Sequence, residues 1–300
     1  MMKSNAHWLA LVAAALLLVV LWTGHDVERG VLVTEVNTLG QWANLETTYL
    51  YAFLHLISFV PVFALSFDKR VHYYTSWKAL LPAIAIVGGF FIIWDVFFTH
   101  IGVWDFNPDY FMGIKWLALP VEEWLFFFTI PFAVVFIYRC LNAYFPRDVL
   151  SQLDRIISWA LIGIFTIVGI IYWGHLYTST TFLLSAILLA YHYYAIPNTY
   201  RTRFYLAYLI SWIPFLIING VLTGVLTESP VVLYNPAEYL DIRIVSVPLD
   251  DSVYSFLLLL GTVSLMEFFE KRWEEKSSQP PLDKYQKPIR QSKPKEVSLP

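Results

Sequence analysis

The sequence predicts an all-α membrane protein, a polytopic bundle of seven or eight transmembrane helices built from two homologous repeats. Of its 300 residues, 58% are hydrophobic and only 14% are charged, whereas a soluble domain is nearer a quarter charged. Apolar runs close to the roughly 20 residues that span a bilayer recur along the chain. They lie at 8–22, 48–66, 79–98, 117–138, 157–173, 181–197, 204–226 and 248–269.

The first run fits either a transmembrane helix or a signal peptide, because it is short and follows Lys3. A basic residue before a short apolar run is also typical of a signal peptide. No small-residue cleavage pattern follows it, so we favour a retained helix and eight spans. Removal of this segment would leave seven.

Basic residues alternate along the connections, which predicts the orientation in the membrane. Connections rich in Lys and Arg lie on the cytoplasmic side, so the sequence predicts a multi-pass protein of the cell membrane with both termini cytoplasmic. The basic connections are 67–78, 139–155, 198–203 and the tail after 270, and the poor ones are 23–46, 99–116, 174–180 and 227–247.

Two stretches of the chain align without a gap. FNPDYFMGIKWLALPVEEWLFFF at 106–128 matches YNPAEYLDIRIVSVPLDDSVYSF at 234–256, and FFIIWD at 90–95 resembles FLIING at 215–220. Four predicted spans separate the two motifs, so both acidic pairs should lie on the non-cytoplasmic side, where the two units can face each other across a common cavity. We divide the chain into an N-terminal segment 1–46, repeats 47–145 and 146–273, and a disordered cytoplasmic tail 274–300, which is rich in Lys, Pro and Ser.

The acidic pairs Glu122-Glu123 and Asp250-Asp251 follow a proline at the start of an apolar run. Proline and acids are common in the first helical turn, so helix initiation alone could explain one copy. The recurrence and the aromatic surroundings favour function, since ionisable groups within spans usually face a cavity or a partner. Neighbouring helical residues point about 100° apart, so one acid of a pair can face a cavity while the other bonds elsewhere.

A proton donor among aromatic faces suits a particular chemistry. Two acids near each other can share a proton, which keeps one of them neutral as a donor. Protonation of an alkene gives a carbocation that water would quench and that aromatic faces stabilise. This pattern favours a cyclase that acts on an apolar polyene.

At these residues the chain resembles the integral-membrane lycopene cyclases, in the form that fuses two homologous units. The resemblance covers roughly 47–145 and 200–270, and the PVEEW motif is its most specific part. The matching stretches are SFDKRVHYYTSWKALLP, FFIIWDVFFTHIGVWDFNPDY, LPVEEWLFFF, RFYLAYLISWIPFLIINGVLTG and IRIVSVPLDDSVY.

The resemblance implies a non-redox, proton-initiated cyclisation of the end groups of lycopene to β-ionone rings, once or twice, in carotenoid biosynthesis. It implies an intramolecular lyase, or isomerase, with no redox cofactor, and the chain carries no GxGxxG fingerprint. We expect no metal and no nucleic acid. The partners would be lycopene and membrane lipid, and association with other carotenoid-pathway enzymes is compatible with this role.

The resemblance also implies the site. Glu122 and Glu123 would act as acid or base, with Asp250 and Asp251 in the matching place. The family leans to Glu followed by an acid there, so the shorter Asp-Asp pair leaves open whether it protonates or only orients and accepts. The expected substrate-binding residues are Trp94, Asp95, Asn107, Trp124, Phe126, Phe127, Asn235 and Tyr254.

Other interpretations stay open. A proton- or cation-coupled transporter is the main alternative, because repeats and intramembrane acids suit it, although such sites usually lie at the membrane midplane. Asp95 could support the acids or simply end its helix. Lys115 and Arg243 could pair with the acids, although we favour interfacial anchors.

Overall fold

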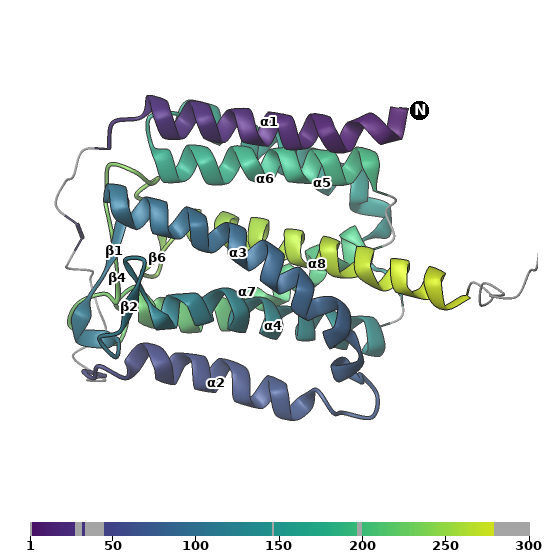
Figure 1. Cartoon of the computed structure of the whole chain (residues 1–300), viewed down its shortest axis with the longest axis horizontal. Helices are drawn as coiled ribbons and strands as arrows, with labels where there is room; N and C mark the ends of the chain where they lie inside the picture. The colour runs from purple at the N-terminus through teal and green to yellow at the C-terminus, as the bar shows by residue number, and fades with distance from the viewer. Residues whose placement is uncertain (1, 28–31, 34–44, 146, 197–199, 279–300) are drawn as a thin grey trace, which may run out of the picture.

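The computed structural model describes residues 2–27, 32–33, 45–145, 147–196 and 200–278. The described part is a bundle of long α-helices with short strands gathered at one end (Figure 1). The helices are α1 (Met2–Gly24), α2 (Leu50–Leu65), α3 (Trp77–Ile101), α4 (Val121–Tyr144), α5 (Asp154–Ile171), α6 (Leu176–Ala195), α7 (Arg201–Leu222) and α8 (Leu249–Ser278), with short 3-10 turns at Tyr73–Ser76, Pro108–Tyr110 and Ser151–Leu153.

Every apolar run predicted from the sequence falls on a helix, so the all-α class is confirmed. α4 begins at Val121, although the apolar run starts at residue 117. The residues before it form a hairpin that ends at Pro120, whose backbone is extended (φ −55°, ψ 147°). At the other end of the chain α8 continues to Ser278, so residues 274–278 of the expected tail are helical, and residues 279–300 lie outside the described part.

Within the described residues, five helical segments are long and apolar enough to cross a membrane. Two shorter apolar helices, Ala10–Gly24 and Leu50–Leu65, accompany them. α6 is not among them, and its first turns carry the fully buried hydroxyl residues Thr178 to Thr181. The five segments are Tyr73–Ile101, Val121–Tyr144, Ser151–Ile171, Arg201–Leu222 and Leu249–Glu275.

The same order of elements occurs twice. In the first unit α2 and α3 precede a strand, a hairpin and α4, and in the second unit α6 and α7 precede a strand, a hairpin and α8. The packing repeats as well, because α2 lies against α4 as α6 lies against α8, and α3 packs on α8 as α7 packs on α4. The two units therefore interlock around a shared core.

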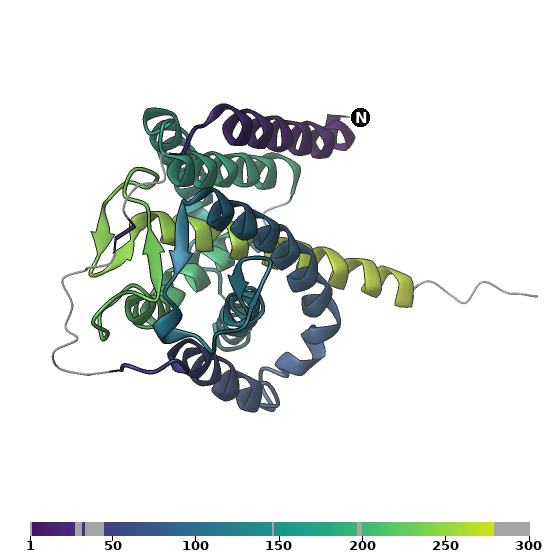
Figure 2. The ribbon, with the colours of Figure 1, turned by 60° about the vertical axis from the view of Figure 1, so that its left-hand side comes forward.

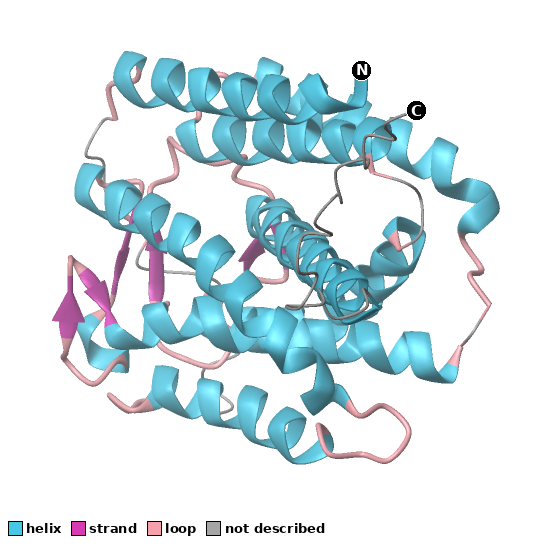
Figure 3. Cartoon of the chain, turned by 45° about the vertical axis from the view of Figure 1, so that its right-hand side comes forward, coloured by secondary structure: helices cyan, strands magenta, loops and turns pink. Residues whose placement is uncertain are grey.

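The strands show the relation between the units most directly. β1 (Trp104–Phe106) pairs antiparallel with β4 (Val232–Tyr234), and Asp105 lies opposite Leu233, its own counterpart 128 residues along the chain. On either side, Asn107 N–H donates to the Val231 carbonyl at 2.8 Å and Asn235 N–H to the Val103 carbonyl at 2.9 Å. Figure 3 shows these strands at one end of the bundle. The pairing exchanges equivalent residues, as a local twofold axis does.

Each unit also has a two-stranded hairpin directly before its last helix. β2 (Lys115–Trp116) pairs with β3 (Leu119–Pro120), and β5 (Arg243–Ile244) pairs with β6 (Val247–Pro248). The turns use left-handed backbone at Leu117 and Ala118 and at Val245, which costs energy for residues with a side chain. The hairpins bring α4 and α8 to the same end of the bundle and fix where each helix starts.

The N-terminal helix breaks the symmetry between the two units. α1 and α5 both pack against α6, whereas α2 packs mainly against α4. Figure 2 shows α1 beside α6 on one side of the molecule. Most of the link from α1 to α2 lies outside the described residues.

Candidate active site

The two acids of each pair point in different directions from the first turn of their helix. Glu122 turns back toward the loop, where its Oε1 accepts a hydrogen bond from the Met112 N–H at 2.8 Å. Asp250 does the same in the second unit, accepting from the Leu240 N–H at 3.2 Å and from the Thr178 hydroxyl at 2.5 Å. These two carboxyls tie each loop to its helix.

The second acid of each pair turns into the bundle and meets a tyrosine of the unit's first helix. Tyr51 on α2 donates a hydrogen bond to Glu123 at 2.5 Å, and Tyr177 on α6 donates to Asp251 at 2.7 Å. Asp251 accepts a further hydrogen bond from Tyr234 at 2.8 Å. All of these side chains are buried, so the phenols orient the carboxyls where water is scarce.

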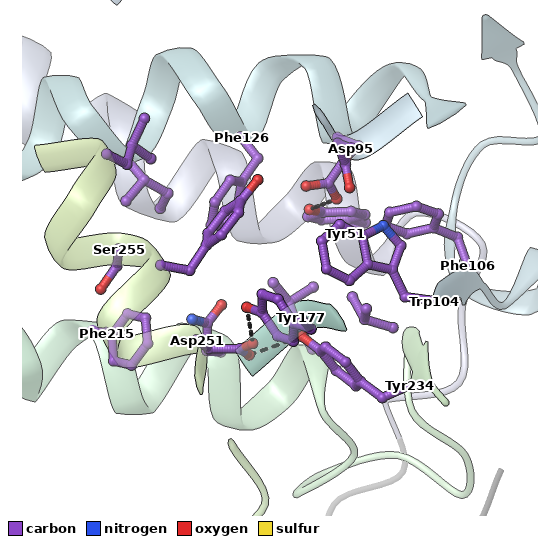
Figure 4. Close-up of a pocket in the computed structure, with 17 residues that line it drawn as sticks. Tyr51, Asp95, Trp104, Phe106, Phe126, Tyr177, Phe215, Tyr234, Asp251 and Ser255 are labelled. Carbon is purple, nitrogen blue, oxygen red and sulfur yellow. Dashed lines mark hydrogen bonds between the residues drawn. The ribbon is translucent and has the colours of Figure 1, made fainter. Parts of the chain in front are cut away.

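A cavity of about 60 Å³ lies between the two tyrosine–carboxyl pairs. Figure 4 shows Asp95 and Tyr51 on one side of it and Asp251, Tyr177 and Tyr234 on the other. Its lining is mainly aromatic and apolar, and none of the described residues in it is basic. The lining residues are Tyr51, Asp95, Trp104, Phe106, Glu123, Phe126, Ile130, Tyr177, Phe215, Asn219, Leu222, Val232, Tyr234, Asp251, Tyr254, Ser255 and Leu258.

The cavity is symmetric in position but not in chemistry. The helix α3 contributes a carboxyl, Asp95, whereas its counterpart α7 contributes an amide, Asn219. Phe106 of the first unit matches Tyr234 of the second, so Asp251 accepts two phenolic hydrogen bonds where Glu123 accepts one. Burial and the nearby Asp251 carboxylate hold the pKa of Tyr234 well above its ordinary value, so its hydroxyl remains a donor.

Some polar groups of the cavity have no hydrogen-bond partner among the described residues. They include Oδ2 of Asp95 and the hydroxyl of Tyr254. Buried polar atoms are usually paired. Unpaired atoms around a cavity are typical of a site that is completed by a ligand.

The structure brings three of the expected substrate-binding residues into the lining, namely Asp95, Phe126 and Tyr254. Trp94 and Phe127 lie one layer further out. The ring of Trp94 packs on Tyr254 with centroids 5.2 Å apart, and that of Phe127 contacts Phe91 at 6.1 Å.

The other three expected residues do not reach the cavity. Trp124 stacks on Trp116, with centroids 4.2 Å apart. Asn107 and Asn235 each accept a hydrogen bond at 3.1 Å from the backbone N–H two residues ahead, and Asn235 also donates to the Gly102 carbonyl at 3.2 Å. They shape the loops beside the strands.

The two basic residues near the acids bond elsewhere. Lys115 lies 3.5 Å from Asp105, and Arg243 donates to the Ser246 carbonyl at 2.5 Å and to the Tyr239 hydroxyl at 2.7 Å. Neither makes an ion pair with Glu123 or Asp251 in the described structure. The carboxyls of the cavity therefore stand without a direct counter-ion.

Sequence reasoning missed the tyrosines that hold the carboxyls. Tyr51 and Tyr177 lie 126 residues apart, each the second residue of its helix, and a search for a second copy of the LY pair would have found them. Tyr234 stands in the aligned motif opposite Phe106, but an aromatic match alone gives no hint of a hydrogen bond. Trp104 and Asn219 carry no comparable signal.

The fold and the site together define a helical membrane protein with a buried acidic cavity at the interface of two repeated units. A family model for lycopene cyclase matches residues 48–141 and 174–269, which is one match in each unit. The chain therefore belongs to the lycopene cyclase family. No curated protein and no solved structure matched it. Membership implies lycopene as substrate and a lipid environment.

Proposed function

We propose that the protein closes the linear end groups of lycopene into β-ionone rings by proton transfer, as an isomerase that needs no redox step. The observation that carries the proposal is the pair of tyrosine-held carboxyls, Glu123 and Asp251, on opposite sides of one aromatic cavity. Family membership supports cyclase chemistry in general, and this geometry favours an acid and a base acting on one substrate.

The groups around the cavity favour a protonated carboxyl on the side of the first unit. Three carboxyls line it without a basic residue among the described ones, and burying several uncompensated charges is costly. Asp251 accepts two phenolic hydrogen bonds, which stabilise a carboxylate. Glu123 accepts one and shares its side of the cavity with Asp95. We therefore assign the acid to Glu123, supported by Asp95, and the base to Asp251.

The reaction balances without a co-reactant. The O–H bond of Glu123 breaks as a C–H bond forms at the terminal double bond of the polyene, which leaves a carbocation. A second double bond supplies the electron pair for the new ring C–C bond and the cation moves into the ring. Asp251 then takes a proton from the adjacent ring carbon, and the C–H electrons form the ring double bond.

The aromatic lining suits the cationic intermediate. The rings of Trp104, Phe126 and Tyr254 face the cavity between the two acids. Aromatic faces attract cations, by about 2 kcal/mol or more where water is excluded. A dry cavity also prevents addition of water to the cation.

Expression in a lycopene-accumulating bacterial host tests the proposal. Pigments from cells with the wild-type chain should contain a ringed carotene, and the position of its ring double bond identifies the β ring. Cells with an empty vector provide the baseline. Untouched lycopene beside a well-expressed, membrane-inserted chain would overturn the proposal and direct attention to proton-coupled transport.

A further inference from the structure

Two apolar grooves flank the acidic cavity, and each is lined by helices of both units. The α2–α4–α7 groove has a volume of about 290 Å³ and includes Ser58, Val62 and Ala133 in its lining. The α1–α3–α6 groove has a volume of about 460 Å³ and includes Leu184, Leu188 and Gly261. These three residues are the second-unit counterparts of the first three, so the two grooves occupy equivalent places.

The grooves differ in their connection to the acids. The α2–α4–α7 groove shares Phe126, Ile130, Phe215, Asn219 and Ser255 with the acidic cavity. The α1–α3–α6 groove shares none of its described lining residues with that cavity. The first groove therefore adjoins the reaction site and the second does not.

A single aligned position accounts for much of this difference. Ser255 lines both the acidic cavity and the α2–α4–α7 groove, and its counterpart in the first unit is Phe127. The buried ring of Phe127 contacts Phe91, whose ring in turn meets Tyr254 edge-on with centroids 4.8 Å apart. The small side chain of Ser255 therefore leaves space between the α2–α4–α7 groove and the acids, whereas aromatic rings fill the equivalent place beside the α1–α3–α6 groove.

Both grooves have an outer edge of exposed apolar side chains. The α2–α4–α7 groove is bordered by Ile57 and Ile217, which are 42% and 62% exposed. These apolar side chains face the hydrocarbon when the helices span a bilayer. The other groove is bordered by Leu11 of α1 and by Ile86, which are 62% and 57% exposed. The α2–α4–α7 groove is the one of the two that shares lining residues with the acidic cavity, so the α2 side is the shorter way from the bilayer to the acids.

The size of the acidic cavity sets what it can hold. A volume of about 60 Å³ exceeds the roughly 10–15 Å³ that one water occupies by the same kind of measure, but only a few-fold. A long polyene cannot fit there, so most of it must lie outside when one end group reaches the acids. The α2–α4–α7 groove is apolar and adjoins the cavity, which matches that requirement.

We propose that the polyene substrate enters from the bilayer through the α2–α4–α7 groove, and that its chain rests there while one end group lies between Glu123 and Asp251. The equivalent groove under α1 is closed from the acids and takes no part in the reaction. A second ring would then require the polyene to leave and return with its other end. This inference rests on the proposed function for the identity of the polyene.

A matched pair of substitutions tests the inference. Val62→Trp fills the α2–α4–α7 groove, and Leu188→Trp makes the equivalent change in the α1–α3–α6 groove. Both positions are half-buried. In membranes that contain equal amounts of protein, we expect Val62→Trp to lower the rate of lycopene conversion at least tenfold and Leu188→Trp to stay within twofold of wild type. Ser255→Phe, which installs the residue of the other unit, should also lower the rate at least tenfold.

Folding and binding are measured alongside turnover. Size-exclusion profiles in detergent establish that each variant is folded, and the absorbance of lycopene retained by the purified protein reports binding. We expect wild type and Leu188→Trp to retain lycopene and Val62→Trp to lose at least four-fifths of it. Equal losses in the two variants, or a loss in Leu188→Trp alone, would overturn the groove assignment while leaving the cyclase intact.

Failure of the proposed function gives a different result. If wild type converts no lycopene, the amount of lycopene that the purified protein retains still tests the groove assignment. Retention that is lost only in Val62→Trp would support the binding groove without the reaction. Retention that is equal in both variants, or no retention by wild type, would overturn the groove assignment.

Discussion

The hydroxyl of Tyr177 donates a hydrogen bond of 2.7 Å to the carboxyl of Asp251, which lies 74 residues further along the chain. Tyr51 and Glu123 make the equivalent contact in the first unit, at 2.5 Å. In each case the first helix of a unit fixes the direction of the carboxyl on the last helix. The orientation of both acids toward one cavity is therefore a tertiary property of each unit.

Substitution of adjacent glutamates should separate chemistry from structure. We expect Glu123→Gln to lower the rate of lycopene conversion by about 100-fold or more, because general acid catalysis contributes roughly 10²–10⁴-fold. Glu122→Gln should stay within a few-fold of wild type, since an amide oxygen can still accept the Met112 N–H. Initial rates in membranes, normalised to the protein present, measure both.

Each of these two variants serves as the control for the other, because the two changes are chemically identical and one residue apart. Equal loss in both variants would contradict the separate roles. A Glu123→Gln variant with wild-type turnover would remove this carboxyl from the reaction.

Removal of a phenol should weaken catalysis through the orientation of Asp251. Tyr177→Phe deletes one of the two hydrogen bonds to this carboxylate, and bonds to charged groups contribute about 1.5–3 kcal/mol. If the activation free energy rises by the same amount, kcat falls by roughly tenfold to a hundredfold. Tyr205→Phe is a control, because that phenol bonds Ser158 away from the cavity. Equal kcat values for Tyr177→Phe and wild type would contradict a positioning role.

Asp95 offers a test in which activity and stability move in different directions. Asp95→Asn gives the first unit the amide that α7 already carries at Asn219. It removes a buried carboxyl whose Oδ2 has no hydrogen-bond partner among the described residues. We expect turnover to fall about tenfold or more, while the thermal midpoint in detergent is unchanged or higher. A lower midpoint with unchanged turnover would make Asp95 a structural residue.

The contact of Asp250 with α6 should matter for stability alone. Thr178→Val deletes the hydroxyl that donates to Asp250 at 2.5 Å and leaves a buried acceptor short of a partner. We expect a loss of about 1–3 kcal/mol in stability, seen as a lower thermal midpoint. Turnover per folded molecule should stay within twofold of wild type, and a larger fall would place Asp250 in the chemistry.

The sequence was sufficient to predict the helices and the position of the acids along them. Apolar runs of spanning length are a direct consequence of the bilayer, and the duplicated PVEEW and PLDDS motifs locate Glu123 and Asp251 at one end of the bundle. The direction of each acid could not be read locally, because the hairpins set the helix starts and the tyrosines bond across more than 70 residues. The amide at Asn219, which breaks the symmetry, becomes meaningful only once α3 and α7 face the same cavity.

A single turnover in D₂O shows whether a carboxyl proton starts ring closure. Purified protein is equilibrated in D₂O so that its acid carries deuterium, and is then mixed with a smaller amount of lycopene. We expect a product one mass unit heavier than lycopene for each ring, since one deuteron is added and one proton is lost. A ringed product of unchanged mass, or one that differs by a pair of hydrogens, would contradict it.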